Sequence, residues 1–141
     1  MSFDGPNYLA VLVAAVASFV FGGVWYGVFA KQWMLAANKS EEDVAGSPKI
    51  AGVQWQLPVT FLALLFMAFM LSGIIGHLGA GQVTLLNGLI SGFFIWLGFV
   101  IPTMYVNHAY QGQPLCLTTI DGGHWLGVLL VQGAVIGMLG V

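Results

Sequence analysis

The sequence predicts an all-α integral membrane protein, a bundle of four transmembrane helices in a single domain over residues 1–141. Hydrophobic residues make up 59% of the 141 residues and charged residues only 6%, whereas soluble domains carry about 25% charged residues. Four apolar runs each reach about 20 residues, the length that an α-helix needs to cross about 30 Å of hydrocarbon. The runs lack the alternation of polar and apolar residues that β-barrel strands require, so helices are expected throughout.

The first span is predicted at about 8–29, from Tyr8 to Phe29. No lysine or arginine precedes it, although a secretory signal begins with a positively charged segment. Lys31 and Trp33 follow it, and this combination is typical of an anchor at the membrane interface. We therefore expect a retained span and not a cleaved signal.

The connection at 31–49 holds all three lysines of the chain together with three acidic residues. Ser40 followed by Asp43 resembles a capping box, in which a hydroxyl caps a free backbone amide, and Gly46 and Pro48 are expected to end the short helix. Because lysine-bearing connections stay in the cytoplasm, we expect this connection to be cytoplasmic and both termini to lie outside.

The other three spans are predicted at about 57–76, 83–105 and 119–140. Pro58 falls in the first turn of its helix, where proline is tolerated, and residues 77–82 are long enough only for a tight hairpin. Pro102 lies inside the third span. Because it cannot donate to the Gly98 carbonyl, a bend is expected there.

Small residues that recur at intervals of four indicate how the helices pack. Lipid tails are as apolar as leucine, so membrane helices associate through close packing and polar pairing. The first span contains Ala14, Ser18 and Gly22 in such a series, and the predicted packing glycines are Gly23, Gly27, Gly88, Gly92, Gly123, Gly127, Gly133 and Gly137. Packing within one bundle is the first interpretation. Contacts between copies in a homo-oligomer are the second, and both can hold.

A polar stripe runs along the fourth span. Asp121, His124, Val128 and Gln132 fall at i, i+3, i+7 and i+11, on one face of a helix. A charge at mid-bilayer costs about 2.5 to 3.5 kcal/mol. Asp121 avoids most of this cost if it lies in the first turn, where Thr118 as N-cap and Asp121 would form a variant capping box. Capping is the first interpretation and ion binding the second.

The predicted topology brings several polar residues to one membrane face. The candidate polar cluster comprises Lys31, Asn107, His108, Asp121, His124 and Gln132. Lys31 is the expected counter-ion of Asp121, and His124 is expected to pair with Asp121 or His108. Such an Asp–His pair can relay protons or hold a cation. A structural histidine is the plainer interpretation, within an interfacial belt of lysine and aromatic residues that includes Trp25, Tyr26, Trp33 and Trp125.

Several short motifs resemble a bacterial family of small four-span membrane proteins known as domain of unknown function 1761. They are Asn7-Tyr8-Leu9-Ala10, Gly22-Gly23-Val24-Trp25-Tyr26-Gly27, Lys31-Gln32-Trp33-Met34, Gly98-Phe99-Val100-Ile101-Pro102, Asn107 and the Gly133–Gly137 tail. The resemblance covers nearly the whole chain and implies an integral protein of the bacterial inner membrane. It implies no activity, substrate or catalytic residue, so no role is carried onto Asp121-Gly122-Gly123-His124.

Three classes of function remain open. The first is a self-associating structural or accessory membrane component, and the second is a small carrier or pore subunit for a cation, proton or polar solute. An enzyme is not expected, because no zinc-type His-Glu-x-x-His, phosphate-binding loop or nucleophile with a base occurs. Cys116 is the single cysteine, so neither a metal nor a cofactor is expected. With no arginine and a net charge of −2, the expected partner is the lipid bilayer and not nucleic acid.

Overall fold

The computed structural model describes residues 5–50, 52–79 and 81–141. Over these residues it confirms the all-α prediction, with four helical segments long and apolar enough to span a membrane. They are α1 (Tyr8–Val28), α4 (Gln56–Gly76), the continuous run of α5 (Leu85–Ile95), η1 (Trp96–Val100) and α6 (Ile101–Tyr110), and α7 (Leu115–Leu139). Asp121 therefore lies in the second turn of α7 and not in the first.

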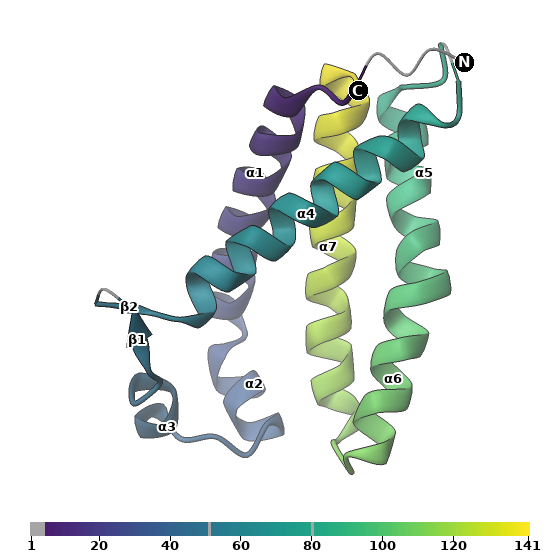
Figure 1. The fold of residues 1–141 in the computed structure, drawn as a ribbon. Coiled ribbons are helices and arrows are strands. Elements are labelled where there is room, and N and C mark those ends of the chain that lie inside the picture. Colours follow the sequence, from purple (N-terminus) through teal and green to yellow (C-terminus); the bar gives the residue numbers. More distant parts are fainter. Residues whose placement is uncertain (1–4, 51, 80) are drawn as a thin grey trace.

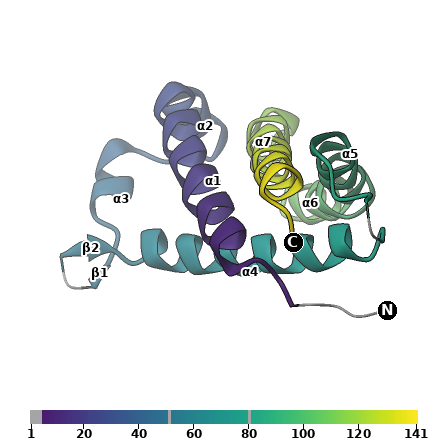
Figure 2. The ribbon, with the colours of Figure 1, turned by 90° about the horizontal axis from the view of Figure 1, so that it is seen from above.

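Three of the spans lie side by side, and the fourth crosses them (Figures 1 and 2). The helix α7 lies between α1 and the α5–α6 segment and packs against both, whereas α4 runs obliquely across one face. The start of α1 and the end of α7 meet, because the Asn7 side-chain amide donates to the Leu139 carbonyl at 3.2 Å. The same side chain caps α1 by accepting from the Ala10 backbone N–H at 3.1 Å.

The first connection is more structured than the sequence predicts. The helix α2 (Ala30–Ala36) continues the line of α1 after a break at Phe29 (Figure 1), so Trp33 lies two turns beyond Tyr26 and near the same face. The chain then reaches α3 (Glu41–Ala45), whose Ser40–Asp43 capping box is confirmed.

A small hairpin that the sequence did not indicate follows α3. Its strands are β1 (Lys49–Ile50) and β2 (Val53–Gln54), paired antiparallel. The Gln54 side-chain amide donates to the Val44 carbonyl at 3.0 Å, which fastens the hairpin to α3.

Pro102 interrupts the third span differently from a simple bend. The turn before it is π-helical, and the Ile101 backbone N–H donates to the Trp96 carbonyl. The Thr103 hydroxyl donates to the Phe99 carbonyl at 2.6 Å. The π-turn with these bonds satisfies part of the backbone near Pro102, as often happens when proline occurs in a membrane helix.

The tightest helix contact joins α5 to α7 and confirms four of the predicted packing glycines. A Cβ placed on Gly88 would meet the backbone carbonyl of Gly133, and a Cβ on Gly133 would meet that of Gly88. Gly92 faces the Leu129 carbonyl in the same way, and Gly137 approaches the start of α5. Glycine is needed here because the two backbones touch.

The contact between α1 and α7 uses only part of the predicted set, Gly22 on α1 with Gly123 and Gly127 on α7. On α7, Gly127 lies under the Phe21 ring and Gly123 under the Trp25 ring. On α1, however, Gly23 and Gly27 are exposed, with no described atom within 4 Å of a Cβ placed on them, so their assignment to packing within the chain was wrong. Each residue turns a helix by about 100°, so the face of α1 that contains Gly22 meets α7 and the neighbouring face does not.

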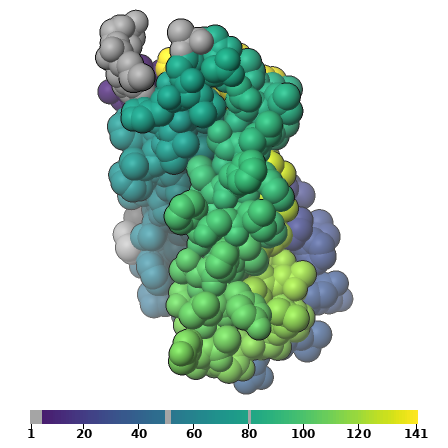
Figure 3. Space-filling view, turned by 90° about the vertical axis from the view of Figure 1, so that its right-hand side faces the viewer, coloured from purple at the N-terminus to yellow at the C-terminus, as the bar shows by residue number. Residues whose placement is uncertain are grey.

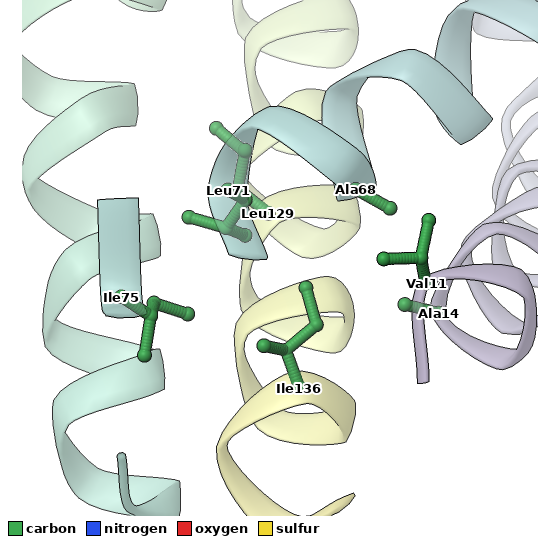
Figure 4. Packing of buried hydrophobic residues seen from close by; sticks show 7 residues of the cluster. All are labelled: Val11, Ala14, Ala68, Leu71, Ile75, Leu129 and Ile136. Atoms are coloured by element: carbon green, nitrogen blue, oxygen red, sulfur yellow. The ribbon is translucent and has the colours of Figure 1, made fainter. Parts of the chain in front are cut away.

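The apolar core lies where α1, α4 and α7 cross. Its buried side chains are Val11, Ala14, Ala68, Leu71, Ile75, Leu129 and Ile136 (Figure 4). The third span contributes little to burial, and its outer face runs uncovered along the molecule in Figure 3. This distribution suits a protein whose outer surface contacts lipid.

Candidate functional site

A cleft of about 810 Å³ lies at the end of the molecule that carries α2 and α3. Its walls come from α1, α2, α3, α4, α6 and α7. All four spans therefore contribute to it, the third only through α6. The lining residues are Tyr26, Ala30, Trp33, Met34, Lys39, Asp43, Val44, Ser47, Gln54, Gln56, Thr60, Met104, His108, Asp121 and Trp125. Of the six residues of the predicted polar cluster, His108 and Asp121 line this cleft.

Asp121 is held in the cleft by two aromatic side chains. The Tyr26 hydroxyl donates to its Oδ1 at 2.7 Å, and the Trp33 indole N–H donates to the same oxygen at 3.1 Å. Its other oxygen, Oδ2, makes no hydrogen bond within the part of the chain that the structure describes. Both donors are neutral, so they orient the carboxylate without compensating its charge.

The predicted capping role of Asp121 was wrong. The helix α7 begins at Leu115, four residues before the predicted start, because extended Pro114 precedes it. Thr118 consequently lies within the helix and not before it. Its side chain is buried, and its hydroxyl forms a hydrogen bond with His108 Nδ1 at 2.9 Å. Asp121 thus lies about 9 Å along the helix at 1.5 Å per residue, too far in to cap the free amides.

Three tryptophans converge on one turn of α7. The Trp25 indole donates to the Ile120 carbonyl at 3.1 Å and the Trp96 indole to the Gly122 carbonyl at 2.8 Å, on either side of Asp121 and its Trp33 bond. The sequence suggested an interfacial belt for such residues. Their N–H groups instead tie α1, α2 and η1 to the segment that carries the carboxylate.

His124 forms neither of its expected pairs. It is 5% exposed, and its ring packs against Tyr26 at 4.8 Å and Trp125 at 4.9 Å between centroids. Its Nδ1 has no hydrogen-bond partner among the described residues, and Asp121 accepts from Tyr26 and Trp33. The Nε2 atom lies against Gly22, where a Cβ would approach it to 2.8 Å.

Gln132 is fully buried and lies away from the cleft, not in the polar cluster to which it was assigned. Its amide donates to the Ser18 hydroxyl and to the Leu64 carbonyl, both at 3.0 Å. These bonds join α7 to α1 and α4. Gln132 therefore acts as a tie between three helices, and Val128, also 0% exposed, fills the space between it and His124.

The remaining members of the predicted cluster, His108, Lys31 and Asn107, lie in different parts of the surface. His108 lines the cleft. Lys31 is exposed at the start of α2 and makes no ion pair with Asp121 in the described residues, so the expected counter-ion is not there. Asn107 is exposed on α6 and lines a separate depression of about 380 Å³ beside the π-turn.

Two further charged residues line the cleft, Lys39 and Asp43. The Ser40 backbone N–H, followed by the Ser40 hydroxyl, holds the pKa of the Asp43 carboxyl below its usual range, and the charge of Lys39 contributes in the same direction. Two carboxylates and one lysine therefore line the cleft, which makes it negatively charged.

Sequence reasoning missed the residues that hold Asp121. Tyr26 and Trp33 were assigned to the interfacial belt, and only their seven-residue spacing, two helical turns, could have placed them near one face. No group of three or more His, Cys, Asp or Glu in the described residues could hold a metal ion.

Comparison with known proteins places the chain in a family without assigning a function. No curated protein and no solved structure matches it. A family model described as "protein of unknown function (DUF1761)" matches residues 9–137, nearly the whole chain. The resemblance found in the sequence motifs is confirmed, and the chain belongs to this family.

Proposed function

We propose that the chain is a membrane-embedded binding protein for a small cation, of the carrier class, and that its site is the Asp121 cleft. One observation carries the proposal. A carboxylate lies about 9 Å inside a membrane-spanning helix, held by two neutral donors at one oxygen while the other is free of hydrogen bonds from the described chain. An ionisable residue within a membrane-spanning helix indicates a functional site by default.

The electrostatics of the cleft support a cation as the ligand. A charged carboxylate in a membrane helix costs a few kcal/mol unless a partner offsets it, and neither Lys31 nor another described residue forms an ion pair with Asp121. A bound cation would supply the missing charge. The surplus of carboxylates over lysine among the lining residues favours the same sign of ligand.

The packing beyond the cleft favours a one-sided binding site over an open pore. His124 closes the inner end between aromatic rings. Farther along α7, Val128, Gln132 and Ile136 are fully buried against neighbouring helices. Passage to the other side would therefore require movement of α7 or its neighbours.

Cation binding can be measured on the protein in nanodiscs of phosphatidylglycerol, with sodium, potassium, ammonium and tetramethylammonium chlorides at constant ionic strength. A ligand at about 100 times its Kd raises the free energy of unfolding by about 2.7 kcal/mol. We expect at least one cation to stabilise the wild type, Asp121→Asn to abolish the effect, and Glu42→Gln, an exposed carboxylate of α3 outside the cleft, to retain it. Equal response of the wild type and Asp121→Asn contradicts the proposal.

We propose further that the chain lies in a bacterial inner membrane with the cleft end in the cytoplasm. The support is that all three lysines belong to α2, β1 and the loop before α3, at the cleft end of the molecule, as the positive-inside rule requires. The exposed Cys116, near the start of α7, is a natural reporter. An impermeant maleimide should label it in inside-out vesicles and not in intact cells. In a Cys116→Ser background, Gln82→Cys on the α4–α5 turn should show the reverse.

Self-association, the other function expected from the sequence, stays a prediction, as does the absence of enzymatic activity. Gly23 and Gly27 lie on an exposed face of α1, which leaves room for a second helix. The molar mass of the protein in detergent, compared with that of Gly27→Leu, tests whether copies meet there.

A further inference from the structure

The walls of the cleft indicate which kind of cation fits it, an inference that rests on the proposed function. Tyr26 and Trp33 stand nearly perpendicular, with centroids 6.3 Å apart and planes at 84°. Trp125 also lines the cleft, as do Met34 and Met104. Aromatic side chains that surround a carboxylate resemble the aromatic cages that attract organic ammonium ions through their ring faces.

A bare metal cation fits these walls less well. Calcium takes about 6–8 oxygen ligands, and magnesium requires a near-octahedral set. The carboxylates of the cleft are Asp121 and Asp43, and Asp43 Oδ2 already accepts from the Ser40 backbone N–H and hydroxyl, both at 2.8 Å. An organic ammonium ion needs only one carboxylate and aromatic faces, which the cleft provides.

The position of the cleft leaves room for a hydrocarbon chain on the ligand. Two of its walls are membrane-spanning helices, α4 through Gln56 and Thr60, and α6 through Met104 and His108. The helix α4 packs against α5 but diverges from α6 toward the cleft end (Figures 1 and 2). Residues of two diverging spans therefore line the cleft, and an alkyl chain on a bound ligand would lie along them toward the bilayer.

We infer that the cleft binds an organic ammonium ion that carries an alkyl chain, with the ammonium group at Asp121 and the chain between α4 and α6. The shared chemistry has two sources. One is a free amphiphilic amine or quaternary ammonium compound. The other is the ammonium headgroup of a membrane lipid.

The test uses the full chain in phosphatidylglycerol nanodiscs, which carry no ammonium headgroup. The probes are potassium, tetramethylammonium and octyltrimethylammonium chlorides, measured by calorimetry with empty discs subtracted. We expect octyltrimethylammonium to bind most tightly and Asp121→Asn to weaken it about tenfold or more, as for loss of a hydrogen-bonded or paired charge. Trp125→Leu should weaken it about 2- to 30-fold through the lost cation–π contact, and Trp125→Phe should restore part of the affinity.

Two matched control variants distinguish binding at the cleft from the general effect of removing an indole or a carboxylate. Trp55→Leu removes a half-exposed indole at the start of α4 that does not line the cleft, and Glu42→Gln removes a carboxylate outside it. Both should bind like the wild type. Trp125→Leu keeps the inference falsifiable if Asp121→Asn does not fold, because Trp125 makes no hydrogen bond to the carboxylate.

The outcomes distinguish the two proposals. Binding of potassium as tight as that of the ammonium ions, lost in Asp121→Asn, overturns the inference and leaves the proposed function standing. Binding of no cation overturns both. Equal affinity for tetramethylammonium and octyltrimethylammonium, after partitioning of the probes into empty discs is subtracted, overturns the inference that the ligand carries an alkyl chain. Adding phosphatidylethanolamine or phosphatidylcholine to the discs identifies the source: competition with octyltrimethylammonium indicates a lipid headgroup, and its absence indicates a free amphiphile.

Discussion

Replacing Gly88 by alanine should separate α5 from α7 and strongly destabilise the protein. The new Cβ would lie 2.8 Å from the Gly133 carbonyl carbon and nearer still to its oxygen, whereas ordinary contacts of a Cβ begin at 3.4 Å. The two helices must therefore move apart by more than about 0.6 Å, the shift that the carbonyl carbon alone requires, or distort locally. The obstacle is backbone, which cannot rotate away as a side chain does.

The expected magnitude combines two opposing effects. Overpacking costs about 1–3 kcal/mol, and the upper end applies because the neighbouring Gly92 and Gly137 contacts would loosen as well. Alanine regains about 1 kcal/mol of helix propensity relative to glycine. The free energy of unfolding should therefore fall by about 2 kcal/mol.

The measurement is unfolding in mixed micelles of dodecylmaltoside and increasing dodecyl sulfate, followed by tryptophan fluorescence. Gly27→Ala is the matched control, since a Cβ there meets open space on the exposed face of α1. This control should leave stability unchanged or raise it by up to about 1 kcal/mol. If Gly88→Ala is as stable as Gly27→Ala, the backbone contact between α5 and α7 does not exist as described.

Three further predictions concern single contacts. Gly22→Ala should destabilise the protein by about 1–3 kcal/mol, because the new Cβ would clash with the His124 ring. Adding His124→Ala should relieve much of that loss. Additive effects of the two substitutions in a double-mutant cycle would contradict the contact. Trp96→Phe keeps the ring but loses the indole bond to α7 and should cost about 0.6 kcal/mol in mixed-micelle unfolding, whereas an unchanged transition speaks against the bond. The pKa of Asp43 is depressed by Ser40, so its stabilisation of α3 is present above the usual carboxyl pKa and is lost as pH falls through the lower folded value. The protection of α3 amides from exchange, relative to the unfolded chain at the same pH, should therefore fall over that range, and Asp43→Asn should show no such fall.

The spans themselves could be predicted because length and hydropathy alone decide them. The run from Tyr8 and the run from Leu57 begin within a residue of the observed helices. The start of α7 was missed because Pro114 and the apolar residues after it extend the helix beyond the glycine-rich motif. Because the helix begins after Pro114, Asp121 lies in its second turn and not in its first.

The site could be predicted only in part, for a geometric reason. The spacing along one helix placed His124 and Gln132 on the same face, and both are buried in the structure. Partners on other helices depend on how those helices rotate and tilt. The choice of Tyr26 over Lys31 as the partner of Asp121 follows from the face that α1 turns to α7, and no pattern within one segment contains that information.

The hydrogen bond from Asn7 to the Leu139 carbonyl brings the first and last helical residues of the chain together. Since the start of α1 and the end of α7 lie at the same end of the bundle (Figure 1), a short linker could join them. A circular permutant opened at the exposed Gly112, in the turn between α6 and α7, should therefore keep its four helices in place. Likewise, two copies fused in tandem through that linker would insert in the same direction, which allows a parallel pair to be built from one polypeptide.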